Sequence, residues 1–176
     1  MDELEAKIAF MVSVLPFAKL IEQTTGLTAR FPMAQVALET GWGQRILKDT
    51  NNLFNIKATE GWQGRRLVFY VPEYKDGKRV YSYEPFRAYP TVAESFDDWL
   101  ELMQTSRYNA IFAPEVRGDV RRIAELVAKA GYATDPRYAD LLAGVATGPT
   151  MEKVFARNDA LEEEARKIDH RAMALI

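Results

Sequence analysis

The sequence predicts an α+β domain that is mostly helical, with one β-hairpin in the middle of the chain. Two observations support this class. Residues before the hairpin and after Pro90 have the apolar spacing of helices. Between them, RRLVFYVPEY and KRVYSYEPF alternate with a period of two and flank Lys75-Asp76-Gly77, and Asp-Gly is a strong signal for a tight hairpin turn. Helices, one hairpin and helices again indicate a dominant helical lobe.

Two helices are expected before the hairpin. The first covers residues 5–24, with a break or kink at Pro16, because proline removes a backbone donor. Thr28 is expected to cap the second helix with its hydroxyl. Gly41 is expected to end that helix, because glycine readily adopts the left-handed conformation. The stretch DTNNLFNIKA then lacks a helical period and predicts an ordered loop.

The helical period returns after the hairpin. The segment TVAESFDDWLELM places five apolar residues on one helix face: Val92, Phe96, Trp99, Leu100 and Met103. Two more helices are predicted, over residues 119–130 and 136–145. The sequence therefore predicts a single domain over residues 1–148, which is large enough to be a catalytic domain.

Residues 149–176 differ in composition and are expected to form an amphipathic helical tail. Its apolar stripe has a 3–4 spacing and includes one polar Asn: Met151, Val154, Asn158, Leu161, Ala165, Ile168, Ala172 and Leu175. Such a stripe can dimerise, which predicts weak self-association through this helix. The alternatives are packing on its own domain, or fraying.

Composition excludes several kinds of chemistry. The chain has 176 residues, a net charge of -2, no cysteine and one histidine, His170. Disulfides and thiol nucleophiles are therefore absent, while a Ser-His-Asp triad and a multi-histidine zinc site are disfavoured. The slightly negative net charge does not indicate a basic surface of the kind that binds nucleic acid. We expect no metal and no cofactor, so carboxylates, tyrosines and amides must perform any reaction.

The N-terminal apolar run IAFMVSVLPFA resembles a signal peptide in length only. Acidic residues precede it where a signal peptide has positive charge, and no small-residue cleavage site follows. A buried helix is the expected structure. No apolar run reaches the ~18 residues of a membrane span.

Glu39 is the first candidate for chemistry. It lies at the end of a predicted helix, in ALETGWG, beside Trp42. The negative end of the helix dipole and the apolar neighbours both disfavour the ionised form and predict a raised pKa for Glu39. A carboxylic acid that stays protonated near neutral pH can act as a general acid in glycoside hydrolysis. The alternative is an ordinary exposed glutamate before a glycine cap.

Several separated motifs resemble one known family. In order they are QVALETGWGQ, NNLFNIKA, GWQG, the hairpin with PEY, and AGYATDPRYA. Together, over roughly residues 15–147, they resemble glycoside hydrolase family 73, the cell-wall β-N-acetylglucosaminidases of bacteria and phages that include the muramidase-like domain of the flagellar rod-cap protein. The resemblance implies a lysozyme-like fold in which a large helical lobe and a small β-hairpin lobe flank a glycan cleft. It also implies that Glu39 is the acid.

The resemblance further implies a second carboxylate in the hairpin. The family's Glu-Tyr pair matches Glu73 and Tyr74, so Glu73 is expected to activate water. It lies 73 − 39 = 34 residues after Glu39, so the hairpin would have to fold over the cleft. Glu84 is the alternative base, or else a partner for a lysine or arginine.

Other site residues follow from the same resemblance. Tyr132 is expected near Glu39, where its hydroxyl would orient water or the substrate's N-acetyl group. The candidates for binding substrate are Trp42, Asn52, Trp62, Tyr74 and Tyr138, although the tryptophans and Tyr138 also suit packing. Asn55 stands where the family usually has glycine, and asparagine tolerates positive φ better than most residues.

These features predict an endo-acting peptidoglycan hydrolase that cuts the β-1,4 bond after N-acetylglucosamine. The alternatives are a lytic transglycosylase or muramidase of the same fold, or a non-catalytic glycan-binding or assembly module. Peptidoglycan strands are the expected partner. Because no signal peptide is recognisable, we expect the protein to reach the cell wall through a holin, lysis or dedicated export, and we favour a phage endolysin over a flagellar enzyme.

Overall fold

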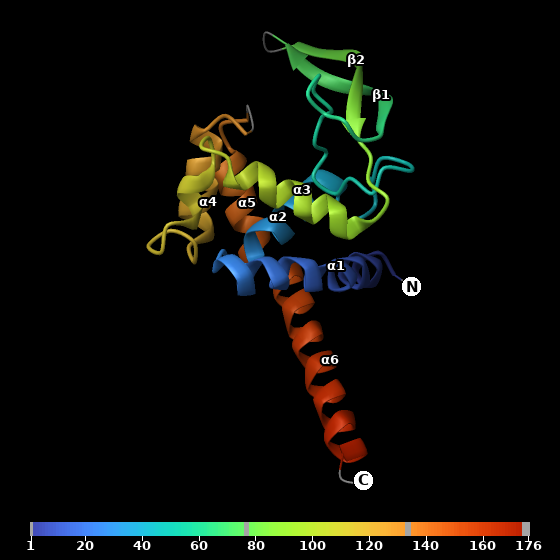
Figure 1. Cartoon of the computed structure of the whole chain (residues 1–176), viewed down its shortest axis with the longest axis vertical. Helices are drawn as coiled ribbons and strands as arrows, with labels where there is room; N and C mark the ends of the chain where they lie inside the picture. The colour runs from blue at the N-terminus through green and yellow to red at the C-terminus, as the bar shows by residue number, and fades with distance from the viewer. Residues whose placement is uncertain (1, 76–77, 133–134, 174–176) are drawn as a thin grey trace.

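The computed structural model describes residues 2–75, 78–132 and 135–173, with the backbone alone at 73–75, 78–79 and 171–173. The described elements, in chain order, are α1 (Glu3–Thr25), α2 (Arg30–Thr40), β1 (Arg66–Lys75), β2 (Lys78–Arg87), α3 (Val92–Gln104), the short 3-10 helix η1 (Asn109–Phe112), α4 (Val120–Lys129), α5 (Tyr138–Thr147) and α6 (Pro149–Met173). The predicted mostly helical α+β class is confirmed (Figure 1). None of the described helices combines the length and apolarity needed to cross a bilayer.

Two details of the first helices differ from expectation. α1 runs through Pro16 without interruption, because Leu15 and Ala18 on either side of it are buried in the core. α2 begins at Arg30 and has no side-chain cap, so the cap predicted at Thr28 is wrong. The Glu22 carboxylate accepts the N–H of Ala29 at 3.0 Å instead.

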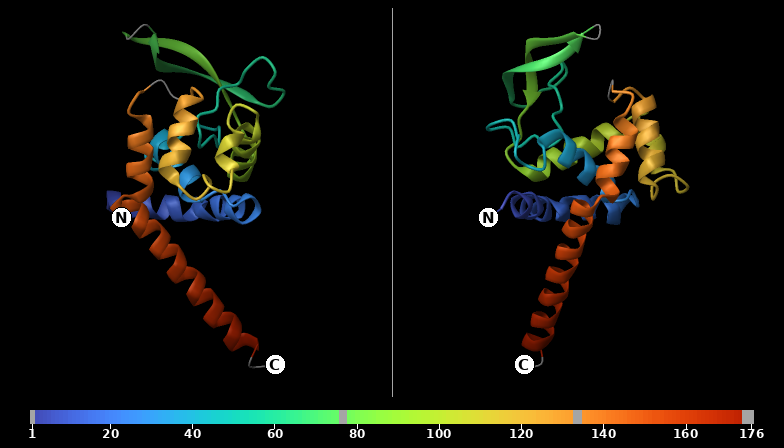
Figure 2. Two further views of the ribbon diagram at one scale, coloured as in Figure 1. Left: turned by 90° about the vertical axis from the view of Figure 1, so that its left-hand side faces the viewer. Right: turned by 180° about the vertical axis from the view of Figure 1, so that it is seen from behind.

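The hairpin has the register that the Asp-Gly signal predicts. β1 and β2 are antiparallel, with Lys75 paired to Lys78 at the turn end. The turn itself, Asp76-Gly77, lies outside the described residues. Phe86 near the base of β2 is buried and bridges to Lys57. The hairpin therefore stands over one end of the helical lobe and is anchored through the loop before it (Figure 2).

Aromatic rings form the centre of the helical lobe. Trp99 of α3 is fully buried, and its ring lies 5.7 Å from Phe31 of α2 and 5.1 Å from Phe54 of the loop after α2. Phe54 also meets Phe96 edge-on at 5.1 Å. These contacts confirm the apolar face predicted for α3. They also hold the 49–58 loop against α3, which packs in turn on α2, the helix that carries Glu39.

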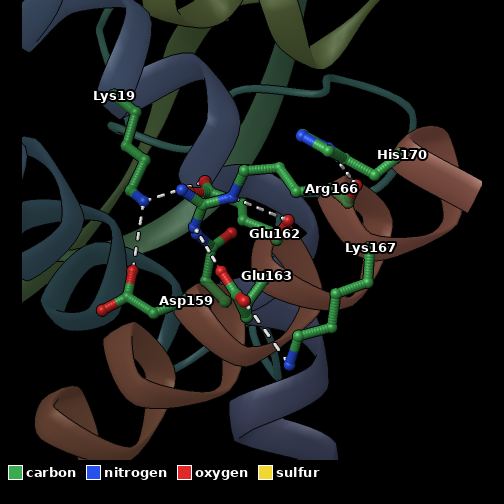
Figure 3. A network of polar contacts seen from close by, with 8 residues as sticks. Lys19, Asp159, Glu162, Glu163, Arg166, Lys167 and His170 are labelled. Carbon is green, nitrogen blue, oxygen red and sulfur yellow. Dashed lines mark hydrogen bonds and ion pairs between the residues drawn. The ribbon is translucent and has the colours of Figure 1, made fainter.

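The first turns of α6 belong to the core, whereas its end extends away from the domain (Figure 1). Met151 and Val154 are fully buried, and Asn158 is nearly so. Lys19 of α1 reaches two acidic side chains of α6, at 3.4 Å to Asp159 and 2.9 Å to Glu162 (Figure 3). The boundary predicted at residue 148 therefore does not separate two independently packed units. The first half of the tail therefore packs on its own domain, which is one of the alternatives expected from the sequence.

Candidate active site

A cleft of about 870 Å³ lies between the helical lobe and the hairpin. Its lining comes from the end of α2, the loop after it, both strands, the end of α3 and the segment before α5. The chemically functional side chains among the lining residues are Glu39, Arg45, Asn55, Lys57, Arg107, Tyr108 and Tyr132. The structure therefore brings Glu39 and Tyr132 into one cleft, as predicted.

The backbone after Glu39 is turned sharply away from the helix. Gly41, Trp42 and Gly43 have consecutive positive φ values of 57°, 61° and 87°. The hydroxyl of Thr40 accepts the N–H of Gly43 at 2.8 Å, and the N–H of Trp42 returns to the carbonyl of Ala37 at 2.9 Å. A side chain at position 43 would meet the ring of Phe10 at 2.4 Å. These constraints end α2 at Thr40 and keep the carboxylate of Glu39 in its last turn.

Asn55 is the direct partner of Glu39. Its Nδ2 donates to Oε2 of Glu39 and to the backbone carbonyl of Glu39, both at 3.1 Å. Asn55 has a φ of 49°, which fits the tolerance expected of asparagine at this position. Burial raises the pKa of Glu39, and the hydrogen bond from Asn55 opposes part of that rise. The net direction is upward, as expected for a general acid.

A buried amide holds the tyrosines beside Glu39. Gln35 lies one turn before Glu39 on α2; its Nε2 donates to the hydroxyl of Tyr138 at 2.8 Å, and its Oε1 accepts from Trp99 at 2.7 Å. The Tyr132 ring packs on Tyr138 with a centroid distance of 5.9 Å. Burial raises the pKa of Tyr132 well above its usual value, and the charge of Glu39 adds to this effect. The Tyr132 hydroxyl therefore stays neutral and able to donate.

The two hairpin glutamates occupy different positions. Glu73 lies in β1 with its backbone paired to Val80, and its side chain lies outside the described residues. Glu84 of β2 is held by Lys57 at 3.1 Å and by the hydroxyl of Ser82 at 2.7 Å. Glu84 therefore has the lysine partner considered for it from the sequence. Val71 and Pro72, just before Glu73, line the cleft.

Three residues expected to bind substrate lie outside the cleft lining. The amide of Asn52 is buried; it donates to the carbonyls of Ile56 and Arg87 and accepts from the N–H of Ile56. Trp62 packs against Tyr89, and the Arg87 guanidinium covers its ring at 4.5 Å. Trp42 faces a separate hollow beside α5. The binding roles of all three stay predictions, and the structure places each side chain in internal packing or on another surface.

The two remaining residues predicted to bind substrate are Tyr138 and Tyr74. Tyr138 is buried, its hydroxyl is bonded to Gln35 and its ring packs on Tyr132, so its contact with substrate stays a prediction. The side chain of Tyr74 lies outside the described residues.

Sequence reasoning missed Gln35, Arg45 and Arg107. Arg107 donates to the carbonyls of Ala130 and Gly131 at 2.7 and 3.0 Å, which fixes the backbone just before Tyr132. Gln35 had a usable signal, since a polar residue four positions before Glu39 shares its helix face. The two arginines had none, because exposed and cleft-lining arginines look alike in sequence. In the side chains that the structure describes, no group of three or more acidic or histidine residues could hold a metal ion.

A helical lobe, a small hairpin lobe and one glutamate of raised pKa in the cleft between them define a lysozyme-like glycoside hydrolase. A family model described as mannosyl-glycoprotein endo-beta-N-acetylglucosaminidase matches residues 15–149. The chain belongs to this glucosaminidase family, family 73 of the glycoside hydrolases.

Named relatives and solved structures agree with this family. Peptidoglycan hydrolase FlgJ of Vibrio parahaemolyticus is 37% identical over 137 residues, which are 75% of this chain and 44% of that protein. A probable N-acetylmuramidase of Lactococcus lactis is 34% identical over 136 residues, which are 74% of this chain and 30% of that protein. The chain therefore spans less than half the length of these relatives.

Among solved structures, a peptidoglycan hydrolase mutant from Sphingomonas sp. A1 is 37% identical, with a TM-score of 0.76 over 85% of this chain and 99% of that chain. The glycoside hydrolase domain of FlgJ from Salmonella typhimurium is 27% identical, with a TM-score of 0.61 over the whole of both chains. The lysozyme-like fold expected from the sequence is confirmed.

Proposed function

We propose that this domain is an endo-acting peptidoglycan hydrolase that cuts the β-1,4 bond after N-acetylglucosamine. The family supports glycosidase chemistry, and relatives named as peptidoglycan hydrolases support the polymer. The observation that carries the proposal is the carboxyl of Glu39 in the cleft, where burial raises its pKa. Such a carboxyl retains the proton that a glycosidic leaving group needs.

The reaction can be written from the residues of the cleft. Glu39 gives its proton to the glycosidic oxygen, and the C–O bond breaks with its electron pair moving to that oxygen. Water then bonds to the anomeric carbon and loses a proton to a base. Glu73 is the proposed base; the alternative is assistance by the substrate's own acetamido group, a known exception to the two-carboxylate scheme. Tyr132 is proposed to orient the water or the acetamido group, because its neutral hydroxyl lines the cleft with Glu39.

Arg45, Lys57 and Arg107 give the cleft a basic lining, which suits a polymer whose sugars and peptides carry carboxylates. The site of action is accordingly the cell wall.

The reducing-end sugar released from purified peptidoglycan tests the proposal. After digestion and borohydride reduction, N-acetylglucosaminitol is the expected product, and the Glu39→Gln variant should release at least ~10²-fold less. Anhydro-sugar products would identify a lytic transglycosylase. Absence of turnover with retained glycan binding would identify a non-catalytic module.

A muramidase is the second candidate, because one relative of 34% identity is named a probable N-acetylmuramidase. That enzyme would cut the other β-1,4 bond of the same polymer, so the same digest would give N-acetylmuramitol. The cleft residues described above would serve either bond.

A further inference from the structure

The position of Asn55 gives it a function beyond shaping the loop. Both hydrogens of its amide are committed to Glu39, one to Oε2 and one to the backbone carbonyl. The contact with the carbonyl fixes the amide orientation, because a flipped amide would place two acceptor oxygens together. Oε2 of Glu39 is therefore a hydrogen-bond acceptor, which leaves Oε1 to carry the transferable proton.

The side-chain oxygen of Asn55 also indicates a function beyond shaping the loop. Oδ1 is buried and has no hydrogen-bond partner among the described residues. An unpaired buried acceptor is unfavourable for stability, and such groups call for a functional explanation. Asn55 also has a positive φ, at a position where the resembling family usually has glycine. A residue chosen for the backbone alone would be glycine.

We propose that Asn55 is a positioning residue for Glu39, which holds Oε2 so that Oε1 delivers the proton and which stabilises the carboxylate left behind. The proposal rests on the proposed function of Glu39 as the acid. As the proton leaves Oε1, negative charge develops on the carboxyl, and the bond from Nδ2 becomes charge-assisted and stronger. An interaction that strengthens along the reaction lowers the barrier, and so acts on kcat more than on KM.

The same bond makes the charged form of Glu39 more favourable. The direction agrees with the opposing effects on its pKa, which burial raises and Asn55 lowers. Among the described side chains, the other charged or titratable groups around Glu39 are Arg45, Lys57, Arg107, Tyr108, Tyr132 and Tyr138. These groups are unchanged in every variant below, so their influence is common to all of them.

The loop provides a matched control. Asn51 has a φ of 50°, close to that of Asn55, and its Nδ2 donates to the carbonyls of Tyr89 and Pro90, both at 3.0 Å. Asn51→Gly and Asn55→Gly therefore remove equivalent side chains from equivalent backbone conformations in one loop. They differ in that Asn55 contacts the proposed acid.

The test measures the pKa of Glu39 directly, by carbon NMR titration of its carboxyl in the full chain, together with the pH profile of kcat. Removing the donor in Asn55→Gly should raise the pKa of Glu39, move the alkaline limb to higher pH and lower the maximal kcat about 10-fold or more. Asn55→Asp keeps the side-chain shape but adds a carboxylate, and should raise the pKa of Glu39 further. Asn51→Gly should leave both readouts unchanged.

Two results would overturn the proposal: a Glu39 titration that is the same in Asn55→Gly and wild type, or an equal shift in Asn51→Gly. If the glycine variant does not fold, Asn55→Asp decides alone, and an unshifted Glu39 there refutes the proposal. The NMR titration needs no turnover. A Glu39→Gln variant that remains active would therefore refute the proposed function separately.

Discussion

Trp99 donates a hydrogen bond of 2.7 Å from its indole nitrogen to Oε1 of Gln35. The other end of the same amide donates to Tyr138 at 2.8 Å, so one buried side chain ties α2 to α3 and α5. Gln35 and Glu39 are one turn apart on α2 and share a face. The network therefore fixes the rotation of α2 about its axis, and this rotation directs the Glu39 carboxylate into the cleft.

Replacing Gln35 by leucine should destabilise the fold. Two buried polar groups would lose their partner, and each such loss costs about 1–3 kcal/mol. We expect the free energy of unfolding to fall by roughly 2–6 kcal/mol, measured by denaturant titration. The exposed Gln63 offers a control, since Gln63→Leu should stay within about 0.5 kcal/mol of wild type. Equal stability of the two variants would mean that the amide network contributes little.

The raised pKa of Glu39 predicts a dependence of stability on pH. The folded state holds this proton more tightly than the unfolded state, so the contribution is complete below the unfolded-state pKa and is lost as pH rises through the folded-state pKa. Glutamine does not titrate. Glu39→Gln should therefore gain stability relative to wild type as pH increases.

Denaturant titrations at pH 4 and pH 8 would measure this gain. Glu101→Gln, on the exposed face of α3, controls for the loss of one negative charge. A difference between Glu39→Gln and wild type that is the same at both pH values would show that the carboxylate is not destabilised by folding.

The two hairpin glutamates should differ in their effect on turnover. Glu73 pairs with Val80, and Glu84 lies four residues further along β2, a separation of about 13 Å at ~3.3 Å per residue. Glu73→Gln should lower turnover by ~10² or more if Glu73 is the base. Glu84→Gln should cost much less, because Glu84 is bonded to Lys57 and Ser82. Near-normal turnover in Glu73→Gln would transfer the base function to the substrate's acetamido group.

Truncation should depend on where the chain is cut. Ending it at Gly148 removes the fully buried Met151 and Val154, and each such side chain contributes about 1.5–3 kcal/mol. It also removes Glu152, which bonds Arg30 at 2.7 Å. We expect a clear loss of folded protein by circular dichroism, contrary to the tolerance that a separate tail implies.

A chain that ends at Glu164 is the matched control. It keeps all of these contacts, and the described side chains that it loses, at residues 165–170, are exposed, so it should unfold at nearly the wild-type temperature. Equal thermal stability of the Gly148 truncation would mean that the rest of the core closes over the exposed surface. Weak self-association, if present, should disappear in the Glu164 truncation, because the exposed Ile168 is removed.

Local signals predicted the elements well. The Asp-Gly pair fixed the expectation of a two-stranded hairpin, and Gly41 ends α2 as expected. The position of Glu39 followed from the motif around it. Each of these depends on residues that are close in sequence, where turn chemistry and capping are decisive.

Contacts between distant residues could not be predicted in this way. Trp42 and Trp62 look equally suited to sugar stacking, but only the folded chain reveals that Arg87 covers one ring and that the other faces another hollow. Asn52 and Asn55 are both asparagines of one loop, yet one is bonded inside the protein and the other meets Glu39. The spacing of the α6 stripe predicted a helix without identifying α1 as its partner.

The three consecutive residues with positive φ after Thr40 separate the position of Glu39 from the length of the loop that follows. Gly41, Trp42 and Gly43 reverse the chain within themselves, and the hydroxyl of Thr40 and the ring of Phe10 hold that reversal from the helical side. Insertions between Gly43 and the 49–58 loop would therefore leave the end of α2 where it is, as long as Asn55 keeps its two bonds to Glu39. The segment just after Gly43 could therefore be lengthened to suit another glycan without moving the acid, whereas the Asn55 end of the loop could not.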